Sequence, residues 1–553
     1  MTPERFDYII IGAGSAGAVL ANRLSEDPDC RVLLLEAGPM DYSLWIHMPS
    51  AFDKPMASRR YNWGYATEPE PFMDGRRMDC PRGHVLGGSS SINGMAYVRG
   101  NALDYEGWAE DFGLEDWRYA DVLPYFRRAE DFDQGANAYH GSGGPLHVTT
   151  GAMRNPLYQA FVDAGVAAGY PATDDMNGYQ QEGFGPMFMT TRDGVRWSTA
   201  NAYLRPVMRR ANLTIRTGAL TETLRLAGTQ VHGVDYRQRG ERRRAEAERE
   251  VLLCAGAINS PQILMRSGIG PAEALREHAI AVRHELPGVG ENLQDHLEVY
   301  VQYACREPIT LFSALKPWNQ ARIGLQWLAT RGGLGASNHF ESGGFIRSEP
   351  GVRYPNLQYH FMPIAVTYDG RVSADCHGFQ AHVGPMRPAS RGRVRLGGSD
   401  PGAAPRIVFN YMADARDRRE MRDAVRLTRE VIEQAPMDRF RDRPLSPAAA
   451  VASDAELDAW VRRHGESAYH PSGTCRMGRA DDPAAVVDGA GRVRGLAGLR
   501  VVDASIMPRI TTGNLNAPTI MIAEKLADAI RGAPAERDPQ PWYEAADWQT
   551  RQR

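Results

Sequence analysis

The sequence predicts an α/β protein of two domains, one with a parallel sheet and an inserted α+β domain with a mostly antiparallel sheet and helices. Three observations support this prediction. The chain has 553 residues, more than a single hydrophobic core normally organises. Two strand–glycine–helix units, at about residues 8–24 and 251–266, are typical of neighbouring parallel strands. Between residues 308 and 467, short alternating strands and long helices indicate a different sheet.

The N-terminal unit has the pattern of a dinucleotide-binding fold. An apolar strand at Tyr8–Ile11 leads into a glycine-rich turn, a helix from about Ser15 to Leu24, and a second strand that ends in Glu36. The glycines let the backbone approach a pyrophosphate, the helix N-terminus faces the phosphates, and the acid hydrogen-bonds a ribose. The sequence therefore predicts a Rossmann-type domain that binds an adenine dinucleotide. The residues expected to bind it in this unit are Gly12, Gly14, Ser15, Gly17, Glu36 and Ala37.

The dinucleotide domain is predicted to be discontinuous. The strand in "EVLLCAGAINSPQILMR" and the strand in "GLRVVDASIMP" both read as buried strands that return to the first sheet. We therefore assign residues 1–155, 212–307 and 468–531 to the dinucleotide domain, and residues 156–211 and 308–467 to a substrate-binding domain. The tail at 532–553 is polar and contains proline, so we expect it to be poorly ordered.

The composition excludes several classes of protein. Hydrophobic residues make up 43% and charged residues 24%, as in an ordinary soluble protein. The net charge of −3 gives no basic surface for nucleic acid. The six cysteines are scattered without a C-x-x-C pair, so we expect no disulfide framework, no metal site and a reducing compartment. No secretory signal or membrane-spanning run is visible, so we expect a cytoplasmic protein, for which peripheral contact with the inner face of the cell membrane stays open.

The stretch "YHPSGTCRMG", Tyr469 to Gly478, predicts a narrow turn that holds one imidazole against a large, flat partner. Proline after His470 keeps that residue out of helical geometry, and the small residues that follow let a bulky group approach. Imidazole, with an unperturbed pKa of about 6.5, accepts protons near neutral pH. Most histidines are structural, and we expect that role for His296 in "LQDHLE". For His470 we predict a catalytic role.

Four ordered segments resemble the glucose-methanol-choline (GMC) family of flavin oxidoreductases over about residues 5–531. They are "GHVLGGSSSINGMAYVRG", "GAINSPQILMRSGIG", "HPSGTCRMG" and "VVDASIMPRITTGNLNAPTIMIAEK". The resemblance implies that the dinucleotide is FAD. It adds as cofactor-binding residues Gly87, Gly88, Ser89, Asn93, Gly94, Ala255, Asp503 and Ala504. Ile92 stands where members with a covalent flavin have histidine, so we predict non-covalent FAD.

The same resemblance implies an alcohol oxidation in which His470 takes the hydroxyl proton and the flavin takes the hydride. The family pairs this histidine with a second histidine or an asparagine further along the chain. Matching "NLNAPTIM" to that region selects Asn516 as the partner, with Asn514 as the alternative.

The segments "RYNWGYATEPEPFM" and "GASNHFESGGFIRS" resemble the choline-oxidising branch of the family. Choline would give betaine aldehyde and then glycine betaine, with a quinone or another acceptor taking the electrons. A trimethylammonium group needs a desolvated carboxylate and aromatic faces, for which we select Glu341, Tyr469 and Trp63. Three alternatives stay open: a relative that oxidises another primary alcohol, aliphatic or aromatic; a nicotinamide-dependent enzyme; and a flavoprotein without catalysis.

Overall fold

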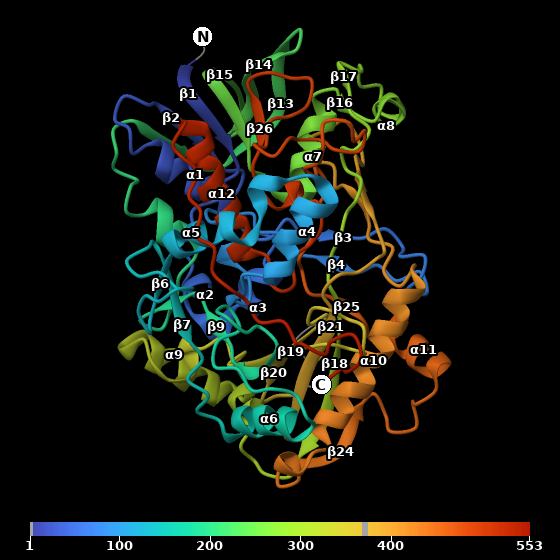
Figure 1. Cartoon of the computed structure of the whole chain (residues 1–553). Helices are drawn as coiled ribbons and strands as arrows, with labels where there is room; N and C mark the ends of the chain where they lie inside the picture. Colours follow the sequence, from blue (N-terminus) through green and yellow to red (C-terminus); the bar gives the residue numbers. More distant parts are fainter. Residues whose placement is uncertain (1–3, 368–373) are drawn as a thin grey trace.

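The computed structural model describes residues 4–367 and 374–553 and contains two seven-stranded sheets, one above the other in Figure 1. The first sheet has the order β12-β2-β1-β15-β14-β13, and β26 pairs with β15. Strands β12, β2, β1, β15 and β26 are parallel, whereas β13, β14 and β15 form antiparallel hairpins. The strands are β1 (Glu4–Ile11), β2 (Val32–Leu35), β12 (Leu213–Arg216), β13 (Ala219–Ala227), β14 (Gln230–Gln238), β15 (Glu241–Leu253) and β26 (Leu499–Val501).

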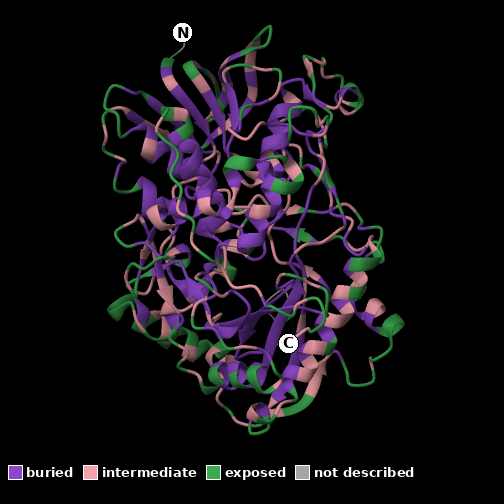
Figure 2. Ribbon diagram, viewed as in Figure 1, coloured by how far each residue is buried: buried purple, intermediate pink, exposed green. Residues whose placement is uncertain are grey.

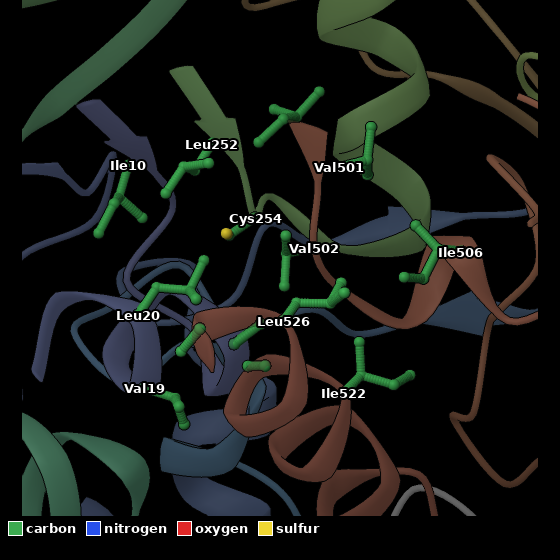
Figure 3. Close-up of a cluster of buried hydrophobic side chains, with 14 of the residues drawn as sticks. Ile10, Val19, Leu20, Leu252, Cys254, Val501, Val502, Ile506, Ile522 and Leu526 are labelled. Carbon is green, nitrogen blue, oxygen red and sulfur yellow. The ribbon is translucent and has the colours of Figure 1, made fainter. Parts of the chain in front are cut away.

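Helices from opposite ends of the chain cover this sheet. Helix α1 (Ser15–Leu24) packs beside α12 (Asn516–Arg531). In Figure 3, Ile10 and Leu252 from the sheet gather with Leu20 of α1 and Leu526 of α12 in one buried apolar cluster. A Cβ on Gly17 would lie 1.9 Å from the carbonyl oxygen of Gly12, so only glycine allows α1 to approach β1 this closely. The predicted α/β class with a parallel dinucleotide sheet is confirmed.

The second sheet is antiparallel, with the order β24-β18-β21-β20-β19-β8 and β25 paired to β18. Helices α6 (Pro156–Ala167), α10 (Ala415–Ile432) and α11 (Asp454–His464) belong to this half, and α6 and α10 pack against the sheet. Its strands are β8 (Gly183–Pro186), β18 (Leu297–Cys305), β19 (Ser342–Ile346), β20 (Leu357–Met362), β21 (Gly378–Pro385), β24 (Arg441–Ser446) and β25 (Glu466–Ser467).

Strand β18 corrects one predicted domain boundary. The sequence assigned residues up to 307 to the dinucleotide domain, but Leu297–Cys305 lies between β21 and β24 of the second sheet. Apolar periodicity identifies a strand without showing which sheet it joins. The chain therefore passes from one domain to the other just before Leu297, about ten residues earlier than predicted.

Shorter elements connect and cover the two sheets. The remaining helices are α2 (Leu44–His47), α3 (Asp53–Ala57), α4 (Ala102–Phe112), α5 (Tyr119–Ala129), α7 (Gly256–Arg266), α8 (Ala272–Glu277) and α9 (Pro317–Thr330). The remaining strands are β3 (Tyr65–Ala66), β4 (Asp79–Cys80), β5 (Ala96–Tyr97), β6 (Glu130–Phe132), β7 (Leu146–Thr150), β9 (Phe188–Met189), β10 (Thr191–Arg192), β11 (Val195–Arg196), β16 (Ile269–Gly270), β17 (His284–Glu285), β22 (Arg393–Arg395) and β23 (Arg406–Val408). Among the described residues, no helix combines the length and apolarity needed to cross a bilayer.

The C-terminal tail packs against the body of the protein, contrary to the predicted poor order. Trp542 lies edge-on to Tyr119 with ring centroids 5.8 Å apart. Arg347 donates from Nη1 to the carbonyl oxygen of Arg551 (2.8 Å), and Gln552 donates from Nε2 to the carbonyl oxygen of Arg347 (2.8 Å). Figure 2 shows buried residues filling both sheets, with exposed residues mainly on the surrounding loops and outer helices. A few large side chains and backbone hydrogen bonds are enough to hold a polar segment of this kind in place.

Candidate active site

A cavity of about 1690 Å³ lies between the two sheets. One end is lined by the glycine turn after β1, with Gly12 and Gly14, and by Glu36 at the end of β2. The other end is lined by Glu298 of β18 and His382 of β21. His470 also lines it, so the cavity joins the predicted dinucleotide turn to the predicted catalytic histidine.

The dinucleotide end is shaped by backbone contacts that only glycine permits. A Cβ on Gly88, which has φ +55°, would lie 2.6 Å from the Cα of Gly14, and Gly14 itself faces the cavity. The two glycine segments therefore form one narrow wall of bare backbone. Glu36 accepts hydrogen bonds from the backbone N–H groups of Ala13 (2.9 Å) and Gly38 (2.8 Å). Burial raises the pKa of its carboxyl to about 7.

Most of the predicted cofactor residues line this cavity. They are Gly12, Gly14, Ser15, Glu36, Ala37, Gly88, Ser89, Asn93, Gly94, Ala255, Asp503 and Ala504. Gly17 and Gly87 do not line it and contribute through close packing instead, because a Cβ on Gly87 would meet Ser91 Oγ at 2.3 Å. Asp503 holds the first turns of α7 by accepting hydrogen bonds from Ser260 Oγ (2.6 Å) and the Gly256 N–H (2.8 Å). An extended cavity with a glycine cradle and a buried acid fits an adenine dinucleotide.

His470 is held from three sides. Its backbone N–H donates to Asp295 Oδ1 (2.6 Å), its Nδ1 lies 3.0 Å from His296 Nδ1, and Asn514 donates from Nδ2 to its Nε2 (3.0 Å). The predicted partner was Asn516, and this choice is corrected to Asn514. Asn516 is the first residue of α12 and accepts a hydrogen bond from Ser15 Oγ (2.7 Å). One residue, Leu515, therefore separates Asn514, which contacts the imidazole, from Asn516, which contacts the dinucleotide turn.

The hydrogen bonds of His296 fix the tautomer of His470. His296 Nε2 lies 2.9 Å from the carbonyl oxygen of Met386, which can only accept, so this nitrogen carries the hydrogen. In the neutral ring, His296 Nδ1 is then an acceptor, and His470 Nδ1 must donate to it. His470 Nε2 is left as the acceptor that receives the Asn514 amide. His296, which we expected to be structural, therefore orients the predicted base.

Burial keeps the imidazoles neutral. It lowers the pKa of His470 well below its usual value, and the nearby basic groups of His296, His360 and Arg82 oppose a second positive charge and lower it further. Burial also lowers the pKa of His296 to about 4. A neutral His470 with a lone pair instead of a hydrogen on Nε2 is the form that accepts a proton, once the Asn514 amide donates to the substrate instead.

Glu341, the predicted substrate carboxylate, is not among the residues that line the cavity. Its two oxygens accept hydrogen bonds from Ser337 Oγ (2.5 Å) and the backbone N–H of Met153 (2.7 Å). Phe340, the residue before it, does line the cavity. The Glu341 carboxylate is instead held by Ser337 and Met153.

Glu298 is the carboxylate that lines the cavity beside His382. His382 donates from Nδ1 to its Oε1 (3.2 Å), and the ring of Tyr300 stacks on His382 with centroids 3.9 Å apart. The Phe340 ring lies 5.6 Å from the same histidine. The predicted rings of Trp63 and Tyr469 also line the cavity. Glu298 was missed because its sequence context "QDHLEVY" has no feature that separates it from an ordinary strand residue.

The GMC oxidoreductase family model matches residues 6–298 with its N-terminal part and residues 388–523 with its C-terminal part. The chain belongs to the GMC oxidoreductase family. It is 60% identical over 546 residues to oxygen-dependent choline dehydrogenase 1 of Chromohalobacter salexigens, covering 98% of this chain and 97% of that protein. It is 57% identical over 558 residues to oxygen-dependent choline dehydrogenase of Paraburkholderia xenovorans, covering 100% and 99%.

Solved structures of two oxidases are similar to the whole of this GMC oxidoreductase. Pyridoxine 4-oxidase from Mesorbium loti superposes with a TM-score of 0.87 at 34% identity, covering 96% of this chain and 100% of that one. Formate oxidase superposes with a TM-score of 0.89 at 25% identity, covering 96% and 99%. The protein is an FAD-dependent alcohol oxidoreductase, and the residues around the cavity are those that would hold FAD.

Proposed function

We propose that this GMC oxidoreductase oxidises choline to betaine aldehyde and then, through the aldehyde hydrate, to glycine betaine. The observation that carries the proposal is the Glu298 carboxylate, which lines the same cavity as His470 beside aromatic rings. A quaternary ammonium offers no hydrogen-bond donor, so it is recognised by a carboxylate and by ring faces. A neutral alcohol would give no reason to place a charge there. The two relatives described above are choline dehydrogenases, which supports the same substrate.

The residues around His470 can remove the hydroxyl proton during this oxidation. Bound FAD supplies the acceptor for the carbon-bound hydrogen and its electron pair. His470 Nε2 takes the hydroxyl proton, and the Asn514 amide, 3.0 Å from that nitrogen, can donate to the substrate oxygen. The amide is oriented because Gln358 donates from Nε2 to Asn514 Oδ1 (3.1 Å). The imidazolium that forms donates from Nδ1 to His296. The hydrate of betaine aldehyde again presents a hydroxyl and a carbon-bound hydrogen.

Anaerobic mixing tests the proposed function. Choline should bleach the flavin absorbance rapidly, whereas 3,3-dimethylbutan-1-ol, which has the same shape without the charge, should do so much less efficiently. Equal second-order rates for the two alcohols would favour the alternative, a GMC dehydrogenase of another primary alcohol.

The electron acceptor is proposed to be a quinone or another non-nicotinamide acceptor. Both choline dehydrogenase relatives are named as oxygen-dependent enzymes. Re-oxidation of the choline-bleached protein by a soluble quinone, compared with air-saturated buffer, decides between these acceptors. The unchanged spectrum expected on adding NAD⁺ is the control.

We propose that FAD is bound without a covalent link, because Ile92 lines the cavity where a linking side chain would stand. Acid precipitation should leave a colourless pellet and release all the flavin into the supernatant. Yellow colour that stays with washed, precipitated protein would contradict this expectation. Mass spectrometry of the intact chain, with the mass of the polypeptide alone expected, gives an independent check.

His296 is proposed as a positioning residue for His470. The His296→Leu variant should keep its FAD and its KM, because His296 does not line the cavity, but its kcat should fall about 10- to 100-fold, as expected for loss of one hydrogen bond to a charged group. The acid limb of kcat/KM should also move to lower pH, since the imidazolium loses its acceptor. The His296→Gln variant retains an acceptor and should recover part of the rate. An unchanged pH profile in the leucine variant would remove the proposed role.

We also propose a cytoplasmic location with peripheral contact at the inner face of the cell membrane. Helix α9 exposes 89% of Trp318 and 67% of Leu325, and the sequence between Glu307 and Glu341 has three cations and no acid. Apolar and basic side chains together favour an anionic lipid surface. Co-sedimentation with phosphatidylglycerol vesicles should be lost in the Trp318→Ser, Leu325→Ser double variant. Vesicle binding that survives both changes would count against this surface.

A further inference from the structure

Arg196, at the end of β11, is a buried guanidinium directly behind the cavity wall. Its side chain is fully buried. Nε donates to the carbonyl oxygen of Ile46 (2.7 Å), and Nη1 donates to the carbonyl oxygens of Ser90 (3.1 Å) and Asn93 (2.7 Å) and to Asn93 Oδ1 (2.8 Å). Each of these partners is neutral. Nη2 is buried and has no hydrogen-bond partner among the described residues.

The charge of Arg196 is unbalanced, unlike that of comparable arginines. Arg99 is paired with Glu130 (2.6 Å) and Arg347 with Glu182 (2.8 Å), and both are as buried as Arg196. No carboxylate of residues 4–367 and 374–553 lies within ion-pair distance of Arg196. Burial lowers its pKa to about 9, which leaves the side chain charged at neutral pH. A buried charge without a counter-ion is costly, so its retention calls for an anion that the folded protein alone does not supply.

The segment that Arg196 holds faces the cofactor cavity. Ser90, Ile92 and Asn93 all line the cavity, and the family resemblance assigns this segment to the isoalloxazine end of FAD. Arg196 binds the reverse side of the segment through Ser90 and Asn93. The positive charge therefore lies one layer of backbone away from the part of the cavity where the flavin ring is expected.

We propose that Arg196 is a positioning residue whose fixed charge raises the reduction potential of the bound flavin. Two-electron reduction increases the negative charge of the flavin ring, and a nearby cation in a site of low dielectric favours the more negative form. The same guanidinium would fix the Ser90–Asn93 wall. Arg196 is thus assigned an electrostatic role that a purely structural arginine would not have.

The experiment measures the two-electron potential of the FAD-loaded protein by spectroscopic titration against a reference dye. The Arg196→Gln variant keeps a donor for the neighbouring carbonyls but removes the charge. Its equilibrium constant for reduction should fall at least tenfold, which corresponds to about 30 mV for two electrons. The Arg196→Lys variant keeps the charge and should retain most of the wild-type potential even if its unfolding temperature falls.

A matched control distinguishes the effect of the Arg196 charge on the flavin potential from a general loss of protein stability. The Arg347→Gln variant removes an equally buried but ion-paired guanidinium, so it should lose stability while its potential stays at the wild-type value. The proposal is overturned if Arg196→Gln has the wild-type potential, or if Arg196→Lys lowers the potential as far as Arg196→Gln does. Should the glutamine variant fail to retain FAD, the wild-type protein still tests the proposal, since a bound potential no higher than that of free FAD contradicts it.

Discussion

The His470→Gln variant is expected to lower kcat for choline by about 10²–10⁴-fold, the usual contribution of a general base. Only the lone pair on Nε2 is available to the substrate, because Nδ1 is committed to His296. Glutamine offers no nitrogen that can take a proton near neutral pH. The measurement is the rate of anaerobic flavin bleaching at saturating choline, with FAD content checked by absorbance.

A control variant tests whether any loss of histidine gives the same effect. His278 contacts the carbonyl oxygen of Leu396 (3.0 Å) and does not line the cavity. The His278→Gln variant should therefore bleach at the wild-type rate. If His470→Gln retained more than about a tenth of the wild-type rate, the assignment of His470 as the base would fail.

The Glu298→Gln variant is expected to reduce kcat/KM for choline about 30-fold or more. Removing one partner of a desolvated charge pair costs about 2 kcal/mol or more, and 1.4 kcal/mol corresponds to a factor of ten. The rate with 3,3-dimethylbutan-1-ol should change much less, because that alcohol has no charge to lose. The decisive measurement is therefore the ratio of kcat/KM for choline to kcat/KM for the neutral alcohol, compared between the variant and the wild type.

Glu341 provides the matched control for this experiment. The Glu341→Gln variant should keep kcat/KM for choline within about threefold of wild type, because that carboxylate faces Ser337 and Met153 and not the cavity. Its unfolding temperature should fall, since one of these hydrogen bonds is lost. A large rise in KM for Glu341→Gln, with no change for Glu298→Gln, would reverse the assignment.

Sequence patterns predicted the dinucleotide-binding half well because its structure depends on residues that are close together in the chain. The glycines after β1, the helix Ser15–Leu24 and Glu36 all follow from steric rules that apply within about thirty residues. The helix at the C-terminal end was also predicted, although α12 begins at Asn516, three residues before the predicted Thr519. The family resemblance then added the second glycine segment and His470.

The partners of His470 were harder to predict because they depend on side-chain direction and on contacts between distant segments. Asn514 and Asn516 differ by two positions, and only the start of α12 decides which one faces the imidazole. His296 is 174 residues away from His470 in the chain. Glu341 and Glu298 both carry a carboxylate beside apolar residues, and only the fold shows which one faces the cavity.

The place where the chain enters β18 has a consequence for which substrates fit. His296, which orients the base, lies just before β18, and Glu298, which lines the cavity, is the second residue of that strand. Residues two positions apart in extended backbone lie about 6.6 Å apart along the chain. The backbone between these two residues therefore sets the distance between the catalytic histidine and the carboxylate proposed to bind the ammonium group. A homologue of choline with one more methylene between hydroxyl and ammonium would have to bend to fit this distance. Choline, with two carbons between these groups, would not.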